Sequence, residues 1–187
     1  MFPKRNGDYI NFINFYNVKK NKYVFRDECT VTKKVERMEN YDKGRRFADL
    51  VASEFRKDKK FTVIDASGTY LGPRRTSEPD LQIQLNGTDI VFAVECVYRE
   101  KIHGDTLAWA SYETFDRYNV TWANLPNPHY FIVVGVGGEP ENPERLFFGH
   151  FREFKYPSLY ESIYKYLERS IKHIPTMALS AIRDIKI

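Results

Sequence analysis

Cysteine is nearly absent from the chain, since only Cys29 and Cys96 occur and they do not form a CxxC pair. A disulfide framework or a zinc site built on closely spaced thiolates is therefore not expected. Cys96 lies in an apolar run, where a thiol usually packs as a small hydrophobe. This sparse use of cysteine predicts a reducing, cytoplasmic setting.

Long apolar stretches are absent as well. No run approaches the about 18 apolar residues of a membrane span, and the N-terminus MFPKRNGDYI has no apolar signal segment. We therefore expect no membrane association. A strong charge bias is also missing, because 29 Lys and Arg face 25 Asp and Glu, for a net charge of +4. Such a balance is compatible with a polyanionic partner and with many ordinary enzymes.

The composition is that of a globular protein. Over 187 residues, 42% are hydrophobic and 29% are charged, which predicts one domain with a substantial core. Basic residues gather in the first third, interleaved with Tyr and Phe: Lys19, Lys20, Lys22, Lys33, Lys34, Lys43, Arg45, Arg46, Lys57, Lys59 and Lys60. This mixture suits phosphate contacts and base stacking, and it equally suits a solvated surface over an aromatic core.

The N-terminal part predicts an extension followed by a helix. Residues 9–35 are rich in aromatic and β-branched residues, so residues 1–40 are expected to form an extension with a β-hairpin. From Tyr41 to Phe55, apolar residues recur at spacings of three and four, as in an amphipathic helix. Glu54 lies on the apolar stripe, and a carboxylate there requires a partner or a ligand.

Three strands should follow this helix. Residues 61–65 (FTVID) predict the first, and the Gly, Pro and Ser content of residues 67–79 predicts a loop. Residues 80–85 (DLQIQL) alternate between polar and apolar, and residues 90–97 (IVFAVECV) form an apolar run typical of a central strand. The Asn86-Gly87 dipeptide between them is a strong hairpin-turn signal.

The second half predicts alternating helices and strands. The expected elements are a helix over 106–118, a strand over 130–136 and an edge strand over 146–148. Ser158 and Glu161 form a capping-box pattern that should begin a last helix, which Pro175 would stop. The order α-β-β-β-α-β predicts an α/β fold with a mixed central sheet flanked by helices. In this interpretation residues 41–150 form the core and residues 151–187 a C-terminal helical segment.

Two acidic residues in the predicted hairpin should lie close together. Asp80 precedes Asn86 by six residues and Glu95 follows Gly87 by eight, so the register brings them within a residue pair or two. Adjacent strands lie about 5 Å apart. Carboxylates that close repel each other, and a divalent cation such as Mg²⁺ relieves that repulsion. The alternative is a solvated Asp80 and a Glu95 paired with a nearby arginine.

At this point the chain resembles the PD-(D/E)xK nuclease superfamily, over residues 41–150. The resemblance is carried by Gly44 and Phe47, by Pro79-Asp80, by AVECVYR, and by WASYETFDRYN with the later YFIVVGVGG. It implies a restriction-endonuclease-like core and a Mg²⁺ or Mn²⁺ ion. By the same resemblance, Asp80, Glu95 and the main-chain carbonyl of Cys96 would bind the metal.

The chain departs from the family pattern at the position of the catalytic lysine, which holds Val97. Strand alternation places Arg99 on the side of Glu95, and Lys101 follows, so either could supply positive charge. The family also often has Glu directly after the helical Phe, where this chain has Ala48. Glu54 is our substitute for that acid.

Other polar residues allow two interpretations each. Glu113, Asp116 and Tyr118 lie where some family members line the phosphate path, or they form an ordinary polar helix face. His103 is expected to be a loop histidine. The stretch from Gly135 to Gly138 invites a dinucleotide-loop interpretation, but the following EPENP cannot open a helix, so a tight turn is expected.

These features predict a Mg²⁺-dependent endonuclease acting on DNA, with RNA not excluded. A homodimer would suit a duplex target. Val97 supports the alternative of a degenerate relative that binds nucleic acid or regulates without cleaving. A small-molecule enzyme on the same architecture also stays open, because fold does not determine function.

Overall fold

The computed structural model describes residues 13–17, 22–26, 28–65, 79–124 and 129–184. The chain divides into two compact units, residues 1–42 and residues 43–187. Among the described helices, none is long and apolar enough to cross a membrane.

The first unit contains a short hairpin and the beginning of a long helix. Strand β1 (Ile13–Asn17) pairs antiparallel with β2 (Lys22–Arg26). Helix α1 spans Glu28–Lys57. The prediction that it begins at Tyr41 was wrong, because residues 28–40 contain neither Gly nor Pro and include several good helix formers.

The second unit is built on a five-stranded mixed sheet in the order β3-β4-β5-β7-β8. Its strands are β3 (Phe61–Asp65), β4 (Leu81–Leu85), β5 (Val91–Arg99), β7 (Tyr130–Glu139) and β8 (Asn142–His150). All neighbours are antiparallel except β5 and β7, which are parallel. The predicted turn between β4 and β5 is confirmed, with Gly87 at a φ of 79°. The predicted mixed sheet with flanking helices is therefore confirmed.

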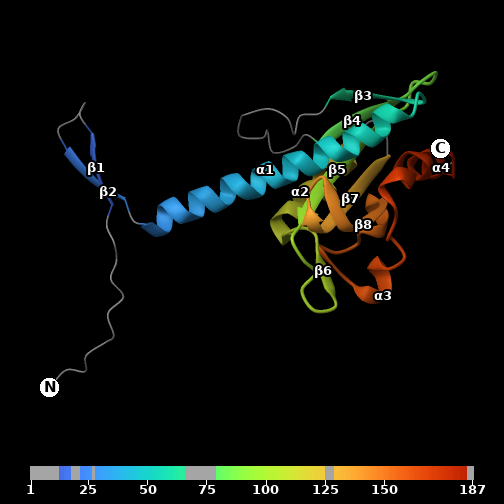
Figure 1. Ribbon diagram of the computed structural model, residues 1–187. Coiled ribbons are helices and arrows are strands. Elements are labelled where there is room, and N and C mark those ends of the chain that lie inside the picture. The colour runs from blue at the N-terminus through green and yellow to red at the C-terminus, as the bar shows by residue number, and fades with distance from the viewer. Residues whose placement is uncertain (1–12, 18–21, 27, 66–78, 125–128, 185–187) are drawn as a thin grey trace. The chain divides into compact units, whose positions relative to one another are not determined.

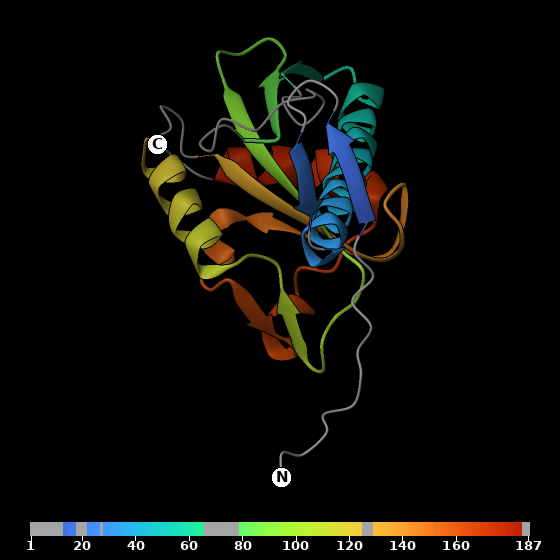
Figure 2. The ribbon, with the colours of Figure 1, turned by 90° about the vertical axis from the view of Figure 1, so that its left-hand side faces the viewer.

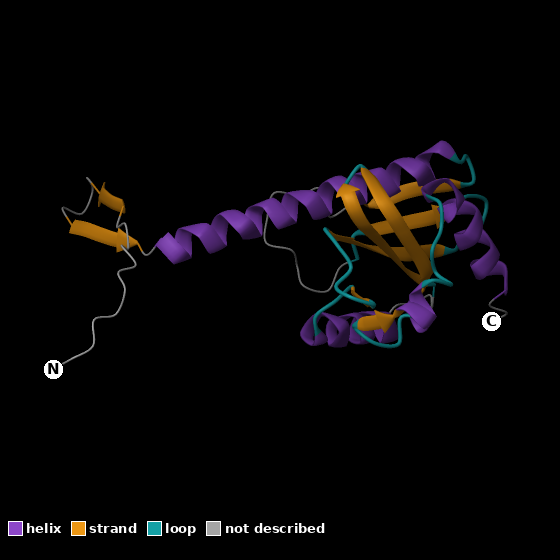
Figure 3. Ribbon diagram, turned by 60° about the horizontal axis from the view of Figure 1, so that its bottom comes forward, coloured by secondary structure: helices purple, strands orange, loops and turns teal. Residues whose placement is uncertain are grey.

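Helices cover both faces of this sheet, as Figures 1 and 2 show. The part of α1 from residue 43 onward and helix α4 (Ile174–Asp184) pack on one face, where Phe47, Val51 and Phe55 meet Val94, Cys96 and Phe131. The other face packs against α2 (Tyr112–Asn124), the 3-10 helix η2 (Phe151–Glu153), and a two-stranded ribbon of β6 (Thr106–Ala108) and β9 (Ser158–Tyr160). Figure 3 shows this arrangement, with the large sheet between α1 and the smaller elements.

The predicted helix over 106–118 was wrong at its beginning. Residues 106–108 form β6, and α2 begins only at Tyr112. The reason is a local cap, because Oγ of Ser111 accepts a hydrogen bond of 3.1 Å from the N–H of Thr114.

The predicted last helix was also wrong. Ser158 lies in β9 opposite Ala108, and the short helix α3 (Glu161–Tyr164) has no side-chain cap. Pro175 does not stop a helix; it lies in the first turn of α4, where a missing N–H costs nothing.

Two stretches near the β7–β8 hairpin depend on glycine. The tight turn predicted over Gly135–Gly138 was wrong in its position, because these residues belong to β7 and the turn into β8 lies at Pro140 and Glu141; Gly137 and Gly138, at φ values of 71° and 63°, bend the strand just before it. The predicted edge strand over 146–148 is part of the longer β8. A Cβ at Gly135 would lie 2.5 Å from the ring of Phe47, so the glycine lets α1 pack closely on the sheet.

Candidate functional site

The central feature of the site is a pair of buried carboxylates on adjacent strands. Leu81 of β4 pairs with Val94 of β5, so Glu95, the next residue of β5, projects from the opposite face, and Asp80, which directly precedes β4, lies beside this end of β5. Asp80 is 2% exposed and Glu95 is 4% exposed. The structure thus brings together the two acids that the hairpin register predicts to converge.

The main chain of Cys96 connects these two acids. Its N–H donates a hydrogen bond of 2.9 Å to Oδ2 of Asp80. Within a strand, the N–H and the carbonyl of one residue point toward the same neighbouring strand, because a residue pair uses both groups to form its two hydrogen bonds. The Cys96 carbonyl therefore points toward the side of β5 on which Asp80 lies, while its thiol is buried against α1.

Two tyrosines donate to the Glu95 carboxylate. The phenol of Tyr118 on α2 donates to Oε1 at 2.6 Å, and the phenol of Tyr130 on β7 approaches Oε2 at 3.5 Å. Burial raises the pKa of Tyr130 far above its ordinary value, and the negative charge of Glu95 raises it further. Tyr130 therefore stays a neutral donor at any physiological pH.

The sequence did not point to Tyr130. Its position follows from the parallel pairing of β5 with β7, in which Glu95 lies opposite Ile132. Tyr130 is two residues before Ile132 and so projects from the same face as Glu95. No local pattern reveals the register of two strands that are joined through a helix.

A buried tryptophan supports the Tyr118 side chain. The rings of Trp109 and Tyr118 stack with centroids 5.7 Å apart and planes at 9°. Nε1 of Trp109 donates to the main-chain oxygen of Tyr156 at 2.7 Å, which holds the indole in place. The Tyr118 hydroxyl is thereby held by packing on one side and by Glu95 on the other.

Val97 occupies the position at which the family resemblance implies lysine. It lies on the same face as Glu95 and packs in an apolar cluster with Leu107, Ile132 and Val134. The described side chain at this position therefore offers no acid, base or positive charge to the two carboxylates.

Arg99, two residues further on the same face, is tied to the main chain. Its guanidinium donates to the carbonyls of Ala108, Tyr98 and Trp109 at 2.9, 2.9 and 2.5 Å. Burial lowers the pKa of Arg99, and the nearby Tyr118 opposes this effect. Three of the five guanidinium N–H groups are engaged in these bonds, so only the other two are left for the role predicted from the sequence, the supply of positive charge to the site.

The other predicted residues lie in the loop after β5 and on α2. Lys101 and His103 are exposed in the loop after β5, and a bridge pairs His103 with Thr106. On α2, Glu113 and Asp116 are exposed, whereas Tyr118 contacts Glu95.

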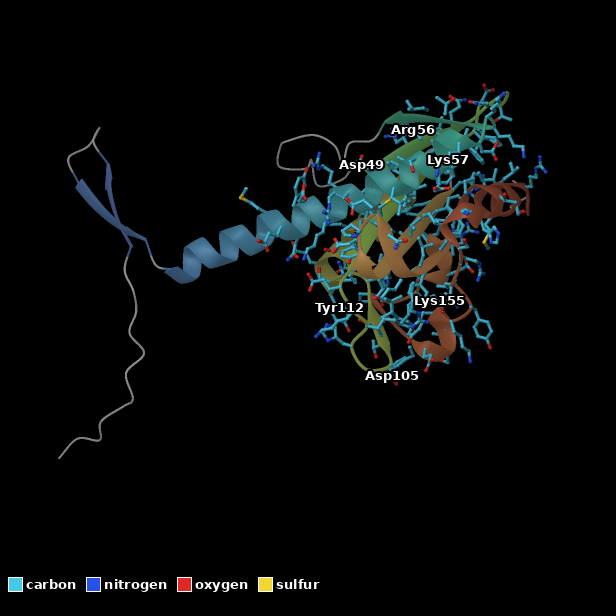
Figure 4. All side chains as sticks on the ribbon, viewed as in Figure 1. Asp49, Arg56, Lys57, Asp105, Tyr112 and Lys155 are labelled. Carbon is cyan, nitrogen blue, oxygen red and sulfur yellow. The ribbon has the colours of Figure 1, made fainter. Side chains whose placement is uncertain are left out.

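Glu54 is not brought to the carboxylate pair. It belongs to α1, which covers the face of the sheet opposite to Glu95, and its carboxylate forms a 2.5 Å ion pair with Lys57. Figure 4 shows Lys57 near the C-terminal end of α1, well separated from Tyr112 at the start of α2. Glu54 thus has a structural partner on its own helix.

The available donors fit a hard divalent cation. Within the described ranges, no group of three or more His, Cys, Asp or Glu side chains is placed to hold a metal ion. The candidate set is instead two carboxylates with the Cys96 carbonyl, all of them oxygen donors. Mg²⁺ usually keeps several waters and is bound by one or two carboxylates together with substrate phosphates, so a set of this size matches the protein's share of such a site.

The comparisons with known proteins identify no relative of this chain: no protein-family model, curated protein or solved structure matches it.

Proposed function

We propose that this protein is a Mg²⁺-dependent phosphodiesterase that cleaves DNA, with a restriction-endonuclease-like core formed by α1, β3, β4, β5, α2 and β7. The observation that carries the proposal is the burial of Asp80 beside the end of β5 that carries Glu95, with the Cys96 main chain next to both. Two buried carboxylates so close are costly unless a cation offsets their repulsion. The resemblance to the PD-(D/E)xK superfamily supports the same assignment.

Each residue of the site has a specific task in this proposal. Asp80, Glu95 and the Cys96 carbonyl would hold the ion. When bound, the ion would supply Lewis-acid stabilisation of the phosphoryl oxygens and a water of lowered pKa. Tyr118 fixes the orientation of the Glu95 carboxylate through its 2.6 Å hydrogen bond. Lys101 is exposed beyond the end of β5, so its ammonium group can reach a phosphate of the DNA, and its positive charge would favour DNA binding.

The second candidate is a DNA-binding relative that does not cleave. The observation favouring it is Val97, whose apolar packing leaves the usual lysine position without an amine. The two carboxylates would then hold no cation, and the hydrogen bonds from the Cys96 N–H, Tyr118 and Tyr130 would offset the cost of burying them.

Cleavage assays separate the two candidates. Labelled single- and double-stranded DNA and RNA are incubated with Mg²⁺, Mn²⁺ or EDTA and with the wild type, Asp80→Asn or Glu95→Gln. Asp89→Asn is the matched control, because Asp89 is an exposed acid at the β4–β5 turn. The proposal predicts metal-dependent cleavage by the wild type and the control, lost in the other two variants.

Cleavage that persists in Asp80→Asn and Glu95→Gln would contradict the proposal. Binding of DNA without cleavage under any metal would replace it with the second candidate. Circular dichroism of each variant confirms that a lost activity is not a lost fold.

A further inference from the structure

Strands β3 and β4 bury only one of their two faces. The apolar cluster on the face of Glu95 takes residues from β5, β7, β8 and the elements that cover them, and it contains no residue of β3 or β4. On the other face, Phe61, Leu81 and Ile83 are buried against α1 and α4. Within the described ranges, β3 and β4 are therefore covered by helices on one face only.

The strand register shows which side chains lie on this bare face of β3 and β4. Thr62 of β3 pairs with Gln84 of β4. Gln82, two residues before Gln84, pairs with Ala93 of β5. Paired residues project from the same face of a sheet, and so do alternate residues of one strand. Ala93 belongs to the apolar cluster on the face of Glu95, so all three polar residues share that face.

Of the three polar residues, Gln82 is nearest to the carboxylate pair. Its partner Ala93 is two residues before Glu95, so Gln82 and Glu95 are diagonal neighbours across the β4–β5 ladder. Diagonal neighbours lie about 7–8 Å apart, within reach of a long side chain. Asp80 is two residues before Gln82 in the chain. The Gln82 carboxamide is thus carried beside both acids.

The hydrogen bonds of these polar residues differ. Oγ1 of Thr62 donates to Oδ1 of Asn86 at 2.8 Å, and Nε2 of Gln84 donates to the carbonyl of Thr88 at 2.7 Å. Both residues are thus held by the β4–β5 turn. Gln82 is half-buried, and its carboxamide donates to no group in the part of the chain that the structure describes. Its two N–H groups are available to a bound molecule.

Three other donors near the carboxylate pair are engaged within the protein. Tyr118 and Tyr130 donate to Glu95, and Arg99 gives three of its N–H groups to main-chain carbonyls. A carboxamide is neutral, so Gln82 can donate to a phosphate oxygen without competing with a cation for the carboxylates. A neutral donor at this place therefore suits a phosphate that is shared with a bound metal ion.

We infer that Gln82 is a substrate-binding residue, whose Nε2 donates a hydrogen bond to a non-bridging phosphate oxygen of DNA that approaches over the bare face of β3 and β4. This inference deepens the proposed function and rests on it. It also assigns the side of approach, because α2, η2 and the β6–β9 ribbon cover the rest of this face of the sheet.

The test measures DNA binding and DNA cleavage separately with the full chain. Binding of a labelled DNA duplex and of a single strand is followed by fluorescence anisotropy with Ca²⁺, which takes oxygen ligands in a looser geometry than Mg²⁺. Cleavage is followed with Mg²⁺ to obtain KM and kcat. Gln82→Met removes the donor at similar length, and Gln82→Glu replaces it with an acceptor. Gln84→Met is the matched control on the same strand and face.

The expected result is a loss of binding at Gln82 alone. Gln82→Met should weaken DNA binding and raise KM at least about tenfold, as loss of a hydrogen bond to a charged group implies. Its kcat should stay within about threefold, because the bond is made to the bound substrate and to the transition state alike. Gln82→Glu should lose at least as much affinity. Gln84→Met should bind DNA like the wild type.

A Mn²⁺ titration separates a lost phosphate contact from a damaged metal site. The Mn²⁺ affinity of Gln82→Met should equal that of the wild type, and a loss of that affinity would overturn the inference. Unchanged DNA binding in Gln82→Met, or an equal loss in Gln84→Met, would overturn it as well.

The outcome also separates this inference from the proposed function. DNA binding that depends on Gln82, with no cleavage under any metal, would keep the phosphate contact and remove the nuclease. Metal-dependent cleavage with the same KM in the wild type and Gln82→Met would do the reverse. A wild type that neither binds nor cleaves DNA would remove both.

Discussion

The phenol of Tyr118 donates a 2.6 Å hydrogen bond to Oε1 of Glu95 and so joins α2 to the central strand β5. In Tyr118→Phe the ring can still stack on Trp109, but the buried carboxylate loses a donor. A lost partner of a buried charged group costs about 1–3 kcal/mol. We therefore expect the free energy of unfolding in urea to fall by about that amount.

The control for this change is Tyr112→Phe, on the same helix. Tyr112 is exposed, so its variant should stay within about 0.5 kcal/mol of the wild type. Equal stability of the two variants would show that the hydrogen bond from Tyr118 to Glu95 does not stabilise the protein.

Gly135 permits the close approach of α1 to the sheet. In Gly135→Ala the new Cβ would lie 2.5 Å from the ring of Phe47, which is fully buried and cannot turn aside cheaply. Overpacking of this kind costs about 1–3 kcal/mol, which thermal unfolding would detect. Gly44→Ala on α1 meets nothing within 4 Å and should instead raise stability by about 0.5–1 kcal/mol. A destabilisation of the same size in both would contradict this packing.

The Tyr130 phenol makes stability depend on alkaline pH. Burial and Glu95 raise its pKa in the folded protein, whereas the unfolded chain releases this proton near pH 10. Below pH 10 the folded and the unfolded protein both keep the Tyr130 proton, so this group does not reduce the free energy of unfolding. Above pH 10 the unfolded chain loses the proton first, and the free energy of unfolding falls by about 1.4 kcal/mol for each pH unit.

The measurement compares the wild type with Tyr130→Phe by urea unfolding between pH 8 and pH 11. Other groups titrate in this range in both proteins, so the difference between the two curves isolates Tyr130. The wild type should lose stability more steeply above pH 10. Parallel curves would show that the pKa of Tyr130 is not raised in the folded protein.

Local signals explain which parts of the fold could be predicted from the sequence. The β4–β5 hairpin is encoded by an alternating strand, an Asn86-Gly87 turn and an apolar strand, all within twenty residues or so, and its register brings Asp80 to Glu95. The ribbon is different, because residues 106–108 pair with residues 158–160 far along the chain. Strands of three residues are too short to show an alternation, and the local patterns there, a helical periodicity and a capping box, predict helices instead.

The site shows the same limit. Asp80 and Glu95 follow from the hairpin, but Tyr130 depends on the parallel register of β7 against β5, which nothing local determines. The prediction for Glu54 depends on its place on the apolar stripe of α1. The ion pair with Lys57 and the opposite face of the sheet explain that position without a metal.

Val97 offers a test by gain of function. In Val97→Lys an amine would be placed on the face of Glu95, at the position implied by the family resemblance. If the surrounding site is competent, Mg²⁺-dependent DNA cleavage should rise by about a hundredfold, the effect typical of a positioned acid or base. Val97→Met, of similar length without the charge, is the control. Equal rates in the two variants would mean that the site cannot use the amine.

Direct measurement of metal binding tests the central claim of a shared cation. Mn²⁺ is titrated into the wild type, Asp80→Asn, Glu95→Gln and the exposed-acid control Asp89→Asn, with binding followed by calorimetry and by the electron paramagnetic resonance of free Mn²⁺. We predict one site in the wild type and the control, weakened at least about tenfold in the other two variants, as loss of a charged oxygen ligand implies. A wild type that binds no Mn²⁺ at millimolar concentration, or variants that bind it equally well, would contradict the account.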